Sequence, residues 1–514
     1  MKKLVSVLLV LLLCTASLSA LAEYDTKVSF TINSTHSNAS MDYNSDALYA
    51  FFAEKFNFEY DVWPVAKDAQ SEKVRVWING GTMPDTLTWR DFNTNYQEFV
   101  IYAEQGLLAP LPEGWEEAYP NLYDMVQSTG MYEKMQVDGE TYAIPHATFS
   151  RYVDIEPLPS HMNVYYRKDW VEALGLEPFG TVVTMEQLKE YLTLAIKNDM
   201  AQNGNTLGLC DYPTNLTMLF TMFGRVQYNQ FMRTEDGYAL AAAQPGFTDT
   251  IKHGREWYAD GVLDPDYYLI SWAEATNNFT SGVSASMYGS CAVTSYMAYK
   301  ATFRDSTGLD PDECIGVAAI AADDGTTYIN ETDNFWSATF FSPDIAPETF
   351  DRILSVMDYI CTEEGQMVSM LGVKGETWDL DGDGNIVMLT EQDENGNYPA
   401  TADLYNSFNV FRCLGILADD FGFVSPSSDP RVVEQILACY AAKGEGVINP
   451  TDYDYAFFAS DNKANFSMDF VNEITRLIIT PDLDIDAEWS AYLETNKAMW
   501  QPVVDDLNAA FVTE

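Results

Sequence analysis

The sequence predicts an α/β protein with two lobes, and three observations lead to this fold class. The chain has 514 residues, more than a single hydrophobic core usually serves, so two or more lobes are expected. Hydrophobic residues make up 47% of the chain, which is enough to fill more than one core. Strand patterns alternate with helix patterns along the sequence, which favours largely parallel sheets covered by helices.

The first elements follow a strand, helix, strand order. Residues 28–32 alternate like a strand, residues 46–56 carry apolar side chains at helical spacing, and residues 59–62 form the next strand. Residues 73–78 predict a helix that stops at two glycines and leads into a buried strand at 84–89. Further helices are expected at 184–198, 247–258, 348–370, 430–440 and 488–511.

Residues 1–22 are set apart from the fold as a predicted secretory signal. Lys2 and Lys3 precede an apolar run at 4–13, and residues 20–22 read Ala-Leu-Ala, which supplies small residues at a cleavage site. We therefore expect an exported protein that is extracellular or associated with the cell envelope.

A lipid anchor at Cys14 is the alternative to cleavage after Ala22. Lipidation signals resemble a small residue before the cysteine, whereas Leu13 stands there in this chain, so cleavage is favoured. Beyond the leader, no stretch approaches the roughly 18 to 20 consecutive apolar residues that span a bilayer. The mature chain is therefore expected to be soluble.

The charge of the chain excludes one class of partner. Acidic residues number 77 against 28 basic ones, for a formal net charge of -49, and such a surface repels nucleic acid and anionic lipid headgroups. A solvated surface that keeps an exported protein monomeric is preferred over an acidic binding groove.

The cysteines indicate neither a zinc site nor a small disulfide scaffold, because none of them forms a Cys-x-x-Cys pair. An exported location allows one or two disulfides, but the spacing does not assign their pairing. Isolated buried thiols are at least as good an interpretation. The cysteines beyond the leader are Cys210, Cys291, Cys314, Cys361, Cys413 and Cys439.

Short motifs follow one another in a characteristic order. They read GGTMPD at 80–85, YAEQGLLAPL at 102–111, DGETYAIP at 138–145, YRKDW at 166–170 and WYADGVLDP at 257–265. Each motif is weak alone, but their common order resembles that of the family 1 extracellular solute-binding proteins. The resemblance extends over nearly the whole mature chain.

The resemblance implies a type II periplasmic-binding-protein-like fold, with hinge-linked lobes and a central cleft between them. The first lobe is expected at 23–146 and 282–341, and the second at 147–281 and 342–514 with C-terminal helices. The implied function is the solute-binding component of a bacterial ABC importer, which delivers a carbohydrate, in our interpretation an oligosaccharide, to the transmembrane permease subunits.

The sequence favours binding over catalysis. It contains no G-x-S-x-G, H-E-x-x-H, G-x-x-x-x-G-K-[ST] or G-x-G-x-x-G motif, and no cofactor is expected. Its four histidines, at 36, 146, 161 and 253, are distant from one another in sequence. A secreted glycan hydrolase stays open, because two catalytic carboxylates need only be close in space. A binding protein for a non-sugar polar nutrient is the other alternative.

Aromatic residues make up 14% of the chain, and their rings can stack on the C–H faces of sugars while polar neighbours bind the hydroxyls. The ligand-binding residues are expected in segments that the resemblance places between the lobes, with Trp89 and Trp336 as stacking platforms. The predicted set is Ser34, Thr35, His36, Trp89, Arg90, Asp91, His146, Arg151, Trp272, Tyr288, Asn334 and Trp336.

One short segment resembles a calcium loop, with oxygen side chains at the first, third, fifth and seventh positions and Gly384 at the sixth. The twelfth position is Thr390 rather than the usual Glu. A solvated hairpin turn is therefore the favoured interpretation, and a structural calcium ion is the alternative. The four oxygen-bearing residues are Asp379, Asp381, Asp383 and Asn385.

Overall fold

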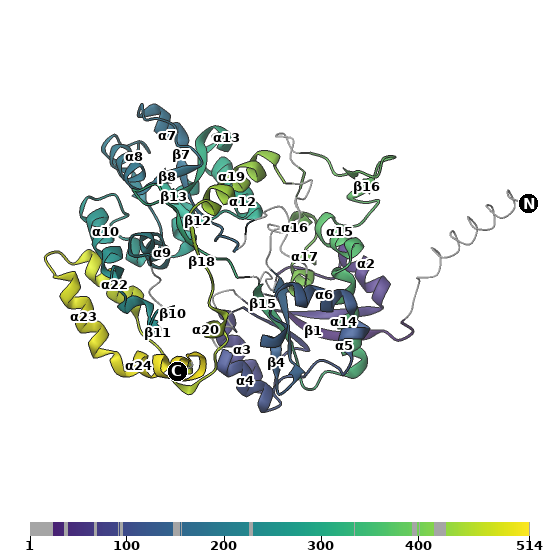
Figure 1. Ribbon diagram of the computed structural model, residues 1–514. Helices are drawn as coiled ribbons and strands as arrows, with labels where there is room; N and C mark the ends of the chain where they lie inside the picture. The colour runs from purple at the N-terminus through teal and green to yellow at the C-terminus, as the bar shows by residue number, and fades with distance from the viewer. Residues whose placement is uncertain are drawn as a thin grey trace, which may run out of the picture.

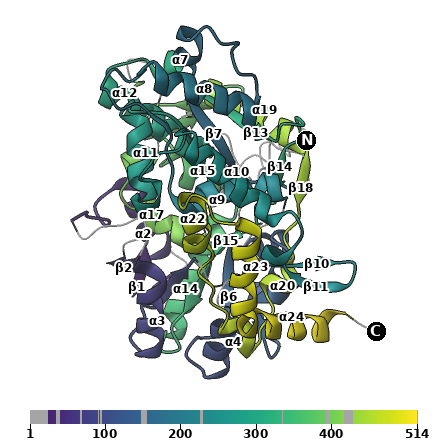
Figure 2. The same ribbon diagram turned by 90° about the vertical axis from the view of Figure 1, so that its left-hand side faces the viewer.

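The computed structural model describes residues 24–34, 40–65, 69–90, 92, 96–147, 155, 157–225, 230–333, 335–392, 398–399, 401–415 and 428–512, without the side chains of Thr294 and Trp336. Within these ranges the elements form two lobes, each built on one five-stranded sheet. Figure 1 shows them side by side, and Figure 2 shows the second lobe, with α7, α8 and α12, above the first lobe, with β1, α3 and α14.

The first lobe is built on a sheet with strand order β2-β1-β3-β15-β6. β1 pairs in parallel with β2 and β3, whereas β15 is antiparallel to both β3 and β6. Its elements are β1 (Val28–Ser34), α2 (Ala47–Phe56), β2 (Phe58–Pro64), α3 (Gln70–Asn79), β3 (Thr86–Trp89), α4 (Tyr96–Glu104), α5 (Trp115–Ala118), α6 (Pro120–Ser128), η2 (Tyr132–Met135), β4 (Gln136–Val137), β5 (Glu140–Thr141), β6 (Ala143–Ala147), β15 (Phe335–Phe341), α14 (Pro347–Ile360), α15 (Glu363–Leu371), β16 (Trp378–Leu380), β17 (Ile386–Met388), α16 (Thr401–Leu404), α17 (Phe408–Phe411) and η5 (Arg412–Leu414).

Helices cover both faces of this sheet, because neighbouring residues of a strand point to opposite faces. On β15, Phe341 packs with α14 side chains such as Ile353, while Phe340 packs with α4 through Phe99. The strands are therefore apolar on both faces, as expected for a sheet buried between helical layers.

The second lobe is built on a sheet with strand order β8-β13-β7-β12-β9, in which β7 is antiparallel to both of its neighbours. Its elements are β7 (Met162–Arg167), α7 (Lys168–Ala173), β8 (Val182–Thr184), α8 (Met185–Lys197), β9 (Leu207–Leu209), α9 (Pro213–Gly224), β10 (Phe231–Thr234), β11 (Gly237–Leu240), η3 (Ala241–Ala243), α10 (Phe247–Ala259), η4 (Tyr267–Leu269), α11 (Trp272–Thr280), β12 (Ser284–Ser290), α12 (Val293–Thr307), α13 (Pro311–Cys314), β13 (Ile315–Ala321), α19 (Pro430–Gly444), α21 (Asp461–Ala464), α22 (Phe470–Ile479), α23 (Ile485–Thr495) and α24 (Lys497–Phe511).

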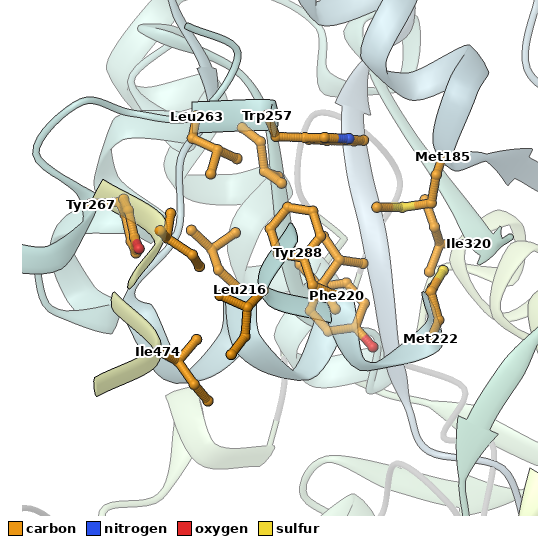
Figure 3. Close-up of a cluster of buried hydrophobic side chains, with 14 of the residues drawn as sticks. Met185, Leu216, Phe220, Met222, Trp257, Leu263, Tyr267, Tyr288, Ile320 and Ile474 are labelled. Atoms are coloured by element: carbon orange, nitrogen blue, oxygen red, sulfur yellow. The ribbon is translucent and has the colours of Figure 1, made fainter. Parts of the chain in front are cut away.

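The largest core of this lobe joins the sheet to the C-terminal helices. Ile474 of α22 and Trp489 of α23 pack in one cluster with Phe220 of α9 and Tyr288 of β12, and Figure 3 shows Ile474, Phe220 and Tyr288 among its side chains. In the described part of the chain, no helix combines the length and apolarity that crossing a membrane requires.

The sheets correct the expected lobe boundaries. β12 and β13 lie within the span 282–341 that was assigned to the first lobe, yet both pair with β7 in the second sheet, and only β15 returns to the first. In the other direction, α14 and α17 were assigned to the second lobe and pack in the first-lobe core. Strand pairing and apolar faces, which act across long sequence separations, decided these memberships.

Most predicted elements are present, and two predicted helices are broken. The strand at 28–32 lies in β1, the helix at 46–56 in α2, and the helix at 184–198 in α8, which Thr184 and Gln187 begin with a capping box. The helix predicted at 348–370 is two helices, α14 and α15, because Thr362 accepts the Gly365 N–H and caps a new helix. Likewise, 488–511 is divided between α23 and α24.

Three extended segments cross between the lobes and lie side by side. They are residues 158–160, residues 328–333 with β14 (Tyr328–Asn330), and residues 447–451 with β18 (Val447–Asn449), which runs between the lobes in Figure 1. β14 and β18 pair in parallel, and the Ser160 N–H donates to the Asn330 carbonyl at 2.7 Å. We call these three segments the joint. α20 (Tyr453–Ala456) follows, and Phe457 packs into the first lobe.

Candidate ligand-binding site

One edge of the first sheet collects the ends of several strands. β1, β3 and β6 run in the same direction, so their carboxyl ends, at Ser34, Trp89 and Ala147, share this edge with Phe335, where the antiparallel β15 begins. We call it the first-sheet edge. Open α/β sheets bind their ligands beyond the carboxyl ends of the strands, and several of the residues predicted from the sequence lie at this edge.

The second sheet has a corresponding edge. β8, β9, β12 and β13 run in one direction, and their carboxyl ends share an edge with Met162, where the antiparallel β7 begins. We call it the second-sheet edge. β7 and β15 each start two residues beyond a joint segment, so both edges adjoin the joint. A molecule placed there can contact both lobes.

His146 closes the first-sheet edge through a buried network of neutral groups. Its Nε2 lies 2.7 Å from Thr339 Oγ1 and its Nδ1 lies 2.6 Å from Ser337 Oγ. Because the Thr339 hydroxyl donates its one hydrogen to the Cys413 carbonyl at 3.0 Å, we assign the ring proton to Nε2, and the Ser337 hydroxyl donates to Nδ1. Burial, followed by the positive charge of Arg412, lowers the pKa of His146 to about 3.

Side-chain hydrogen bonds connect β1, β3 and α3 near this edge, beyond the point where the backbone pairing between β1 and β3 stops. The Asn33 side chain accepts the Thr88 N–H at 2.6 Å, and the Gln70 amide donates to the Thr88 carbonyl at 2.6 Å. The Ser34 hydroxyl donates to the Asn409 carbonyl at 3.2 Å. The segment of α17 and η5 therefore packs over the edge. Nothing in the local sequence indicated this, because Asn409 follows Ser34 by 375 positions.

Three of the predicted ligand contacts in the first lobe, Ser34, Trp89 and His146, are buried in the structure. Trp89 is fully buried, with its ring 5.7 Å from Phe340 and 6.1 Å from Tyr102, so it has no free face for a sugar. His146 is also buried, and its ring nitrogens bond within the lobe. Ser34 is buried as well, whereas Arg90 is half-buried at the same edge.

In the second lobe, Tyr288 is a core residue rather than an exposed contact. Figure 3 shows it among apolar side chains that include Phe220 and Leu216, and only 4% of its surface is exposed. Trp272 begins α11 and is 47% exposed, so part of its side chain is accessible to solvent. The position of Tyr288 in a strand was compatible with a ligand contact or with a core residue. The tertiary packing places it in the core.

The other predicted contacts lie outside the described residues. They are Thr35, His36, Asp91, Arg151 and Asn334, together with the side chain of Trp336.

Sequence reasoning missed Asp211, which lies two residues beyond β9 at the second-sheet edge. Its carboxylate accepts the Tyr288 N–H at 3.0 Å, the Tyr212 N–H at 2.8 Å and the Asn215 amide at 3.1 Å. Burial outweighs these bonds and raises the pKa of Asp211 to about 8. The Asp-Tyr-Pro order at the start of α9 was a usable signal, because Asp and Pro both favour helix starts.

The segment that resembles a calcium loop forms the β16–β17 turn. Asp381 accepts the N–H groups of Asp383 and Asn385, both at 2.9 Å, and the Asn385 side-chain amide at 3.0 Å. The bond from the Asn385 side chain, followed by these backbone bonds, lowers the pKa of Asp381. Within the described residues, no group of three or more His, Cys, Asp or Glu side chains is arranged to hold a metal ion. Calcium binding at Asp379, Asp381, Asp383 and Asn385 stays a prediction.

Solved structures of solute-binding proteins match this fold, whereas comparisons of the sequence found no match. No protein-family model and no curated protein matches the chain. The alginate-binding protein AlgQ2 matches with a TM-score of 0.69 and 16% identity, over 95% of this chain and 99% of that one.

Two further solved structures match to a similar degree. The ABC-transporter substrate-binding protein FusA of S. pneumoniae, in complex with fructo-nystose, has a TM-score of 0.66 and 17% identity over 94% and 100% of the two chains. A solute-binding protein of Bifidobacterium longum infantis, described as HMO binding, has a TM-score of 0.63 and 15% identity over 94% and 98%. The chain therefore has the two-lobed fold of ABC-transporter solute-binding proteins.

Proposed function

We propose that the chain is the exported solute-binding component of a bacterial ABC importer and binds an oligosaccharide between its lobes. The observation that carries the proposal is that both sheet edges adjoin the same three-segment joint, so one molecule can contact both lobes. Solved structures with this fold include proteins described with alginate and fructo-nystose, and these names support a carbohydrate as the ligand class.

Closure of the lobes is the proposed mechanism. A ligand that contacts both edges stabilises the closed state by the contacts that form only on closure. The joint consists of short extended segments, which can absorb a change of backbone angles while the sheets move as rigid bodies. The transmembrane permease subunits then recognise the closed form, and the ligand is released unaltered.

The proposed contacts are the half-buried Arg90 and the exposed Trp272, together with the members of the predicted set that lie outside the described residues. Arg90 supplies hydrogen-bond donors to sugar hydroxyls at the first-sheet edge, and Trp336 and Trp272 supply ring faces. Thr35, His36, Asp91, Arg151 and Asn334 complete the proposed set. Ser34, Trp89, His146 and Tyr288, which are buried, act instead through the packing of the edges.

A glycan panel tests the proposal on the mature chain. Isothermal titration against neutral and acidic oligosaccharides, single sugars and peptides is expected to find one saturable oligosaccharide site. Chromatography of the recovered ligand checks that it is unchanged, and small-angle scattering is expected to show a smaller radius of gyration with ligand. Released sugar would establish a hydrolase, and binding of a peptide with every sugar silent would overturn the carbohydrate assignment.

A further inference from the structure

Directly after the joint, the chain crosses between the lobes again. Phe457, the residue that follows α20, packs in the first-lobe core, with its ring 6.1 Å from Phe92 and 5.6 Å from Phe335. The next residue, Phe458, packs against the second-lobe core instead, with its ring 5.5 Å from Phe511 of α24. The chain therefore changes lobes between two consecutive residues.

α20 itself contacts both lobes. Tyr453 and Ala456 pack against the first-lobe core, whereas Tyr455 packs against the second-lobe core, with its ring 5.6 Å from Phe231 of β10. Figure 1 shows α20 at the lower end of β18. We call residues 453–458 the crossing.

Charged side chains add contacts from the crossing to both lobes. The Asp454 carboxylate lies 2.7 Å from the Arg233 guanidinium of β10 in the second lobe, and 3.9 Å from Lys134 Nζ of η2 in the first. Asp452, which caps α20, accepts the Tyr238 hydroxyl at 2.8 Å. Because the two ion pairs are partly exposed, they contribute less than the packed rings.

Lys463 of α21 holds the backbone of the crossing. Its Nζ donates to the carbonyls of Tyr455, Ala456 and Phe458, at 2.6, 2.8 and 3.0 Å. These carbonyls lie on both sides of the change of lobe, and they take up all three N–H donors of the ammonium group. Hydrogen bonds from a charged donor are stronger than those between neutral groups. One side chain therefore keeps this short segment in one conformation.

We propose that the crossing is a pivot of lobe closure and that Lys463 limits how far its backbone turns. The inference rests on the proposed closure of the lobes around a ligand. When the lobes move, Phe457 and Phe458 stay in different cores, so the backbone between them absorbs part of the rotation.

The bonds from Lys463 restrict the open state to fewer relative orientations of the lobes. Closure then costs less conformational entropy, which favours the ligand-bound state. Without these bonds, the free protein samples more open orientations.

The variant Lys463→Met tests the pivot in the mature chain without any ligand. It keeps an unbranched apolar stem and removes the three N–H donors. Measurements are made at pH 6, because burial lowers the pKa of Lys463 to about 7 and the charged form predominates below it. We expect hydrogen exchange of the amides at 456–458 to be about tenfold faster than in wild type. Small-angle scattering is expected to show a larger radius of gyration.

Two further variants sharpen the test. Lys463→Gln keeps two N–H donors and is expected to give intermediate values, which supplies a second measurement if Lys463→Met does not fold. The control Lys497→Met removes an exposed lysine of α24 that pairs with Glu494, and it is expected to match wild type in both measurements.

Faster exchange at 456–458 with an unchanged radius of gyration would reduce Lys463 to a local cap of α20 and overturn the pivot. Exchange of these amides in wild type at the rate of unprotected amides would also overturn it. Because the comparison uses free protein, its result stands even if the glycan panel finds no bound sugar, so the two proposals fail separately.

Discussion

The two sheet edges are held by different chemistry, although they adjoin the same joint. At the first-sheet edge, His146 is neutral and buried with Ser337 and Thr339. At the second-sheet edge, the Asp211 carboxyl binds the Tyr288 backbone. Burial favours the uncharged form of both groups, but the His146 ring is a base and the Asp211 carboxyl is an acid. Lowering the pH therefore decreases folding stability through His146 and increases it through Asp211.

The sign at each edge follows from proton linkage. The pKa of His146 falls from 6.5 to about 3 on folding, so the unfolded chain binds the extra proton and stability is lost as the pH falls through this range. The pKa of Asp211 rises from 3.8 to about 8, so the folded chain holds the extra proton and stability is gained as the pH falls from 8 toward 4.

The largest expected effect is at the first-sheet edge. His146→Ala removes both ring hydrogen bonds and leaves a cavity beside Ser337 and Thr339, so we expect a loss of about 3 kcal/mol in the free energy of unfolding. Urea denaturation measures it. The control His253→Ala, at a side chain that is 38% exposed, is expected to cost less than about 1 kcal/mol. Equal losses in the free energy of unfolding for the two variants would show that the His146 network stabilises the fold no more than an exposed histidine does.

The next prediction concerns the pH response of the second-sheet edge. Asp211→Asn removes the titrating group, so the variant is expected to lack the gain in stability that wild type shows between pH 8 and 5. Urea midpoints at several pH values measure the difference between the two proteins. Asp305→Asn, at an exposed position of α12, is the control and is expected to keep the wild-type slope. An unchanged slope in Asp211→Asn would contradict the protonation of Asp211.

A smaller effect is expected on ligand binding at the first-sheet edge. Arg90→Ala is expected to weaken the oligosaccharide identified in the panel about tenfold, which corresponds to about 1.4 kcal/mol, with little change in Tm. Isothermal titration measures the Kd. The control Arg476→Ala removes a cation of α22 that pairs with Glu473 and Glu488, and its Kd is expected to match wild type. Equal affinities in all three proteins would remove Arg90 from the site.

The smallest effect is expected at the β16–β17 turn, away from both edges. Calcium chloride is expected to leave Tm unchanged, because Asp381 already accepts backbone N–H groups. Asp381→Ala is expected to lower the Tm slightly through the lost turn bonds. A rise in wild-type Tm with calcium that Asp381→Ala abolishes would support the structural calcium ion instead.

The sequence placed several predicted residues at one sheet edge, but it did not predict which of their side chains are buried. Ser34, Arg90 and His146 were chosen as residues at strand ends, and all three lie at the first-sheet edge. The exposure of each side chain was not predictable. Trp89 is covered by Phe340, which is 251 positions later, and burial by such distant segments leaves no trace in the local pattern.

By itself the sequence determined the α/β class and elements such as β1, α2 and α8, because periodicity and capping act over a few residues. Only the tertiary structure decided that β12 and β13 pair with β7 and that β15 returns to the first sheet. It also decided that His146 is a buried, neutral group. These outcomes depend on contacts between segments far apart in the chain, whose partners are selected by packing and by hydrogen bonds that form only when the lobes fold.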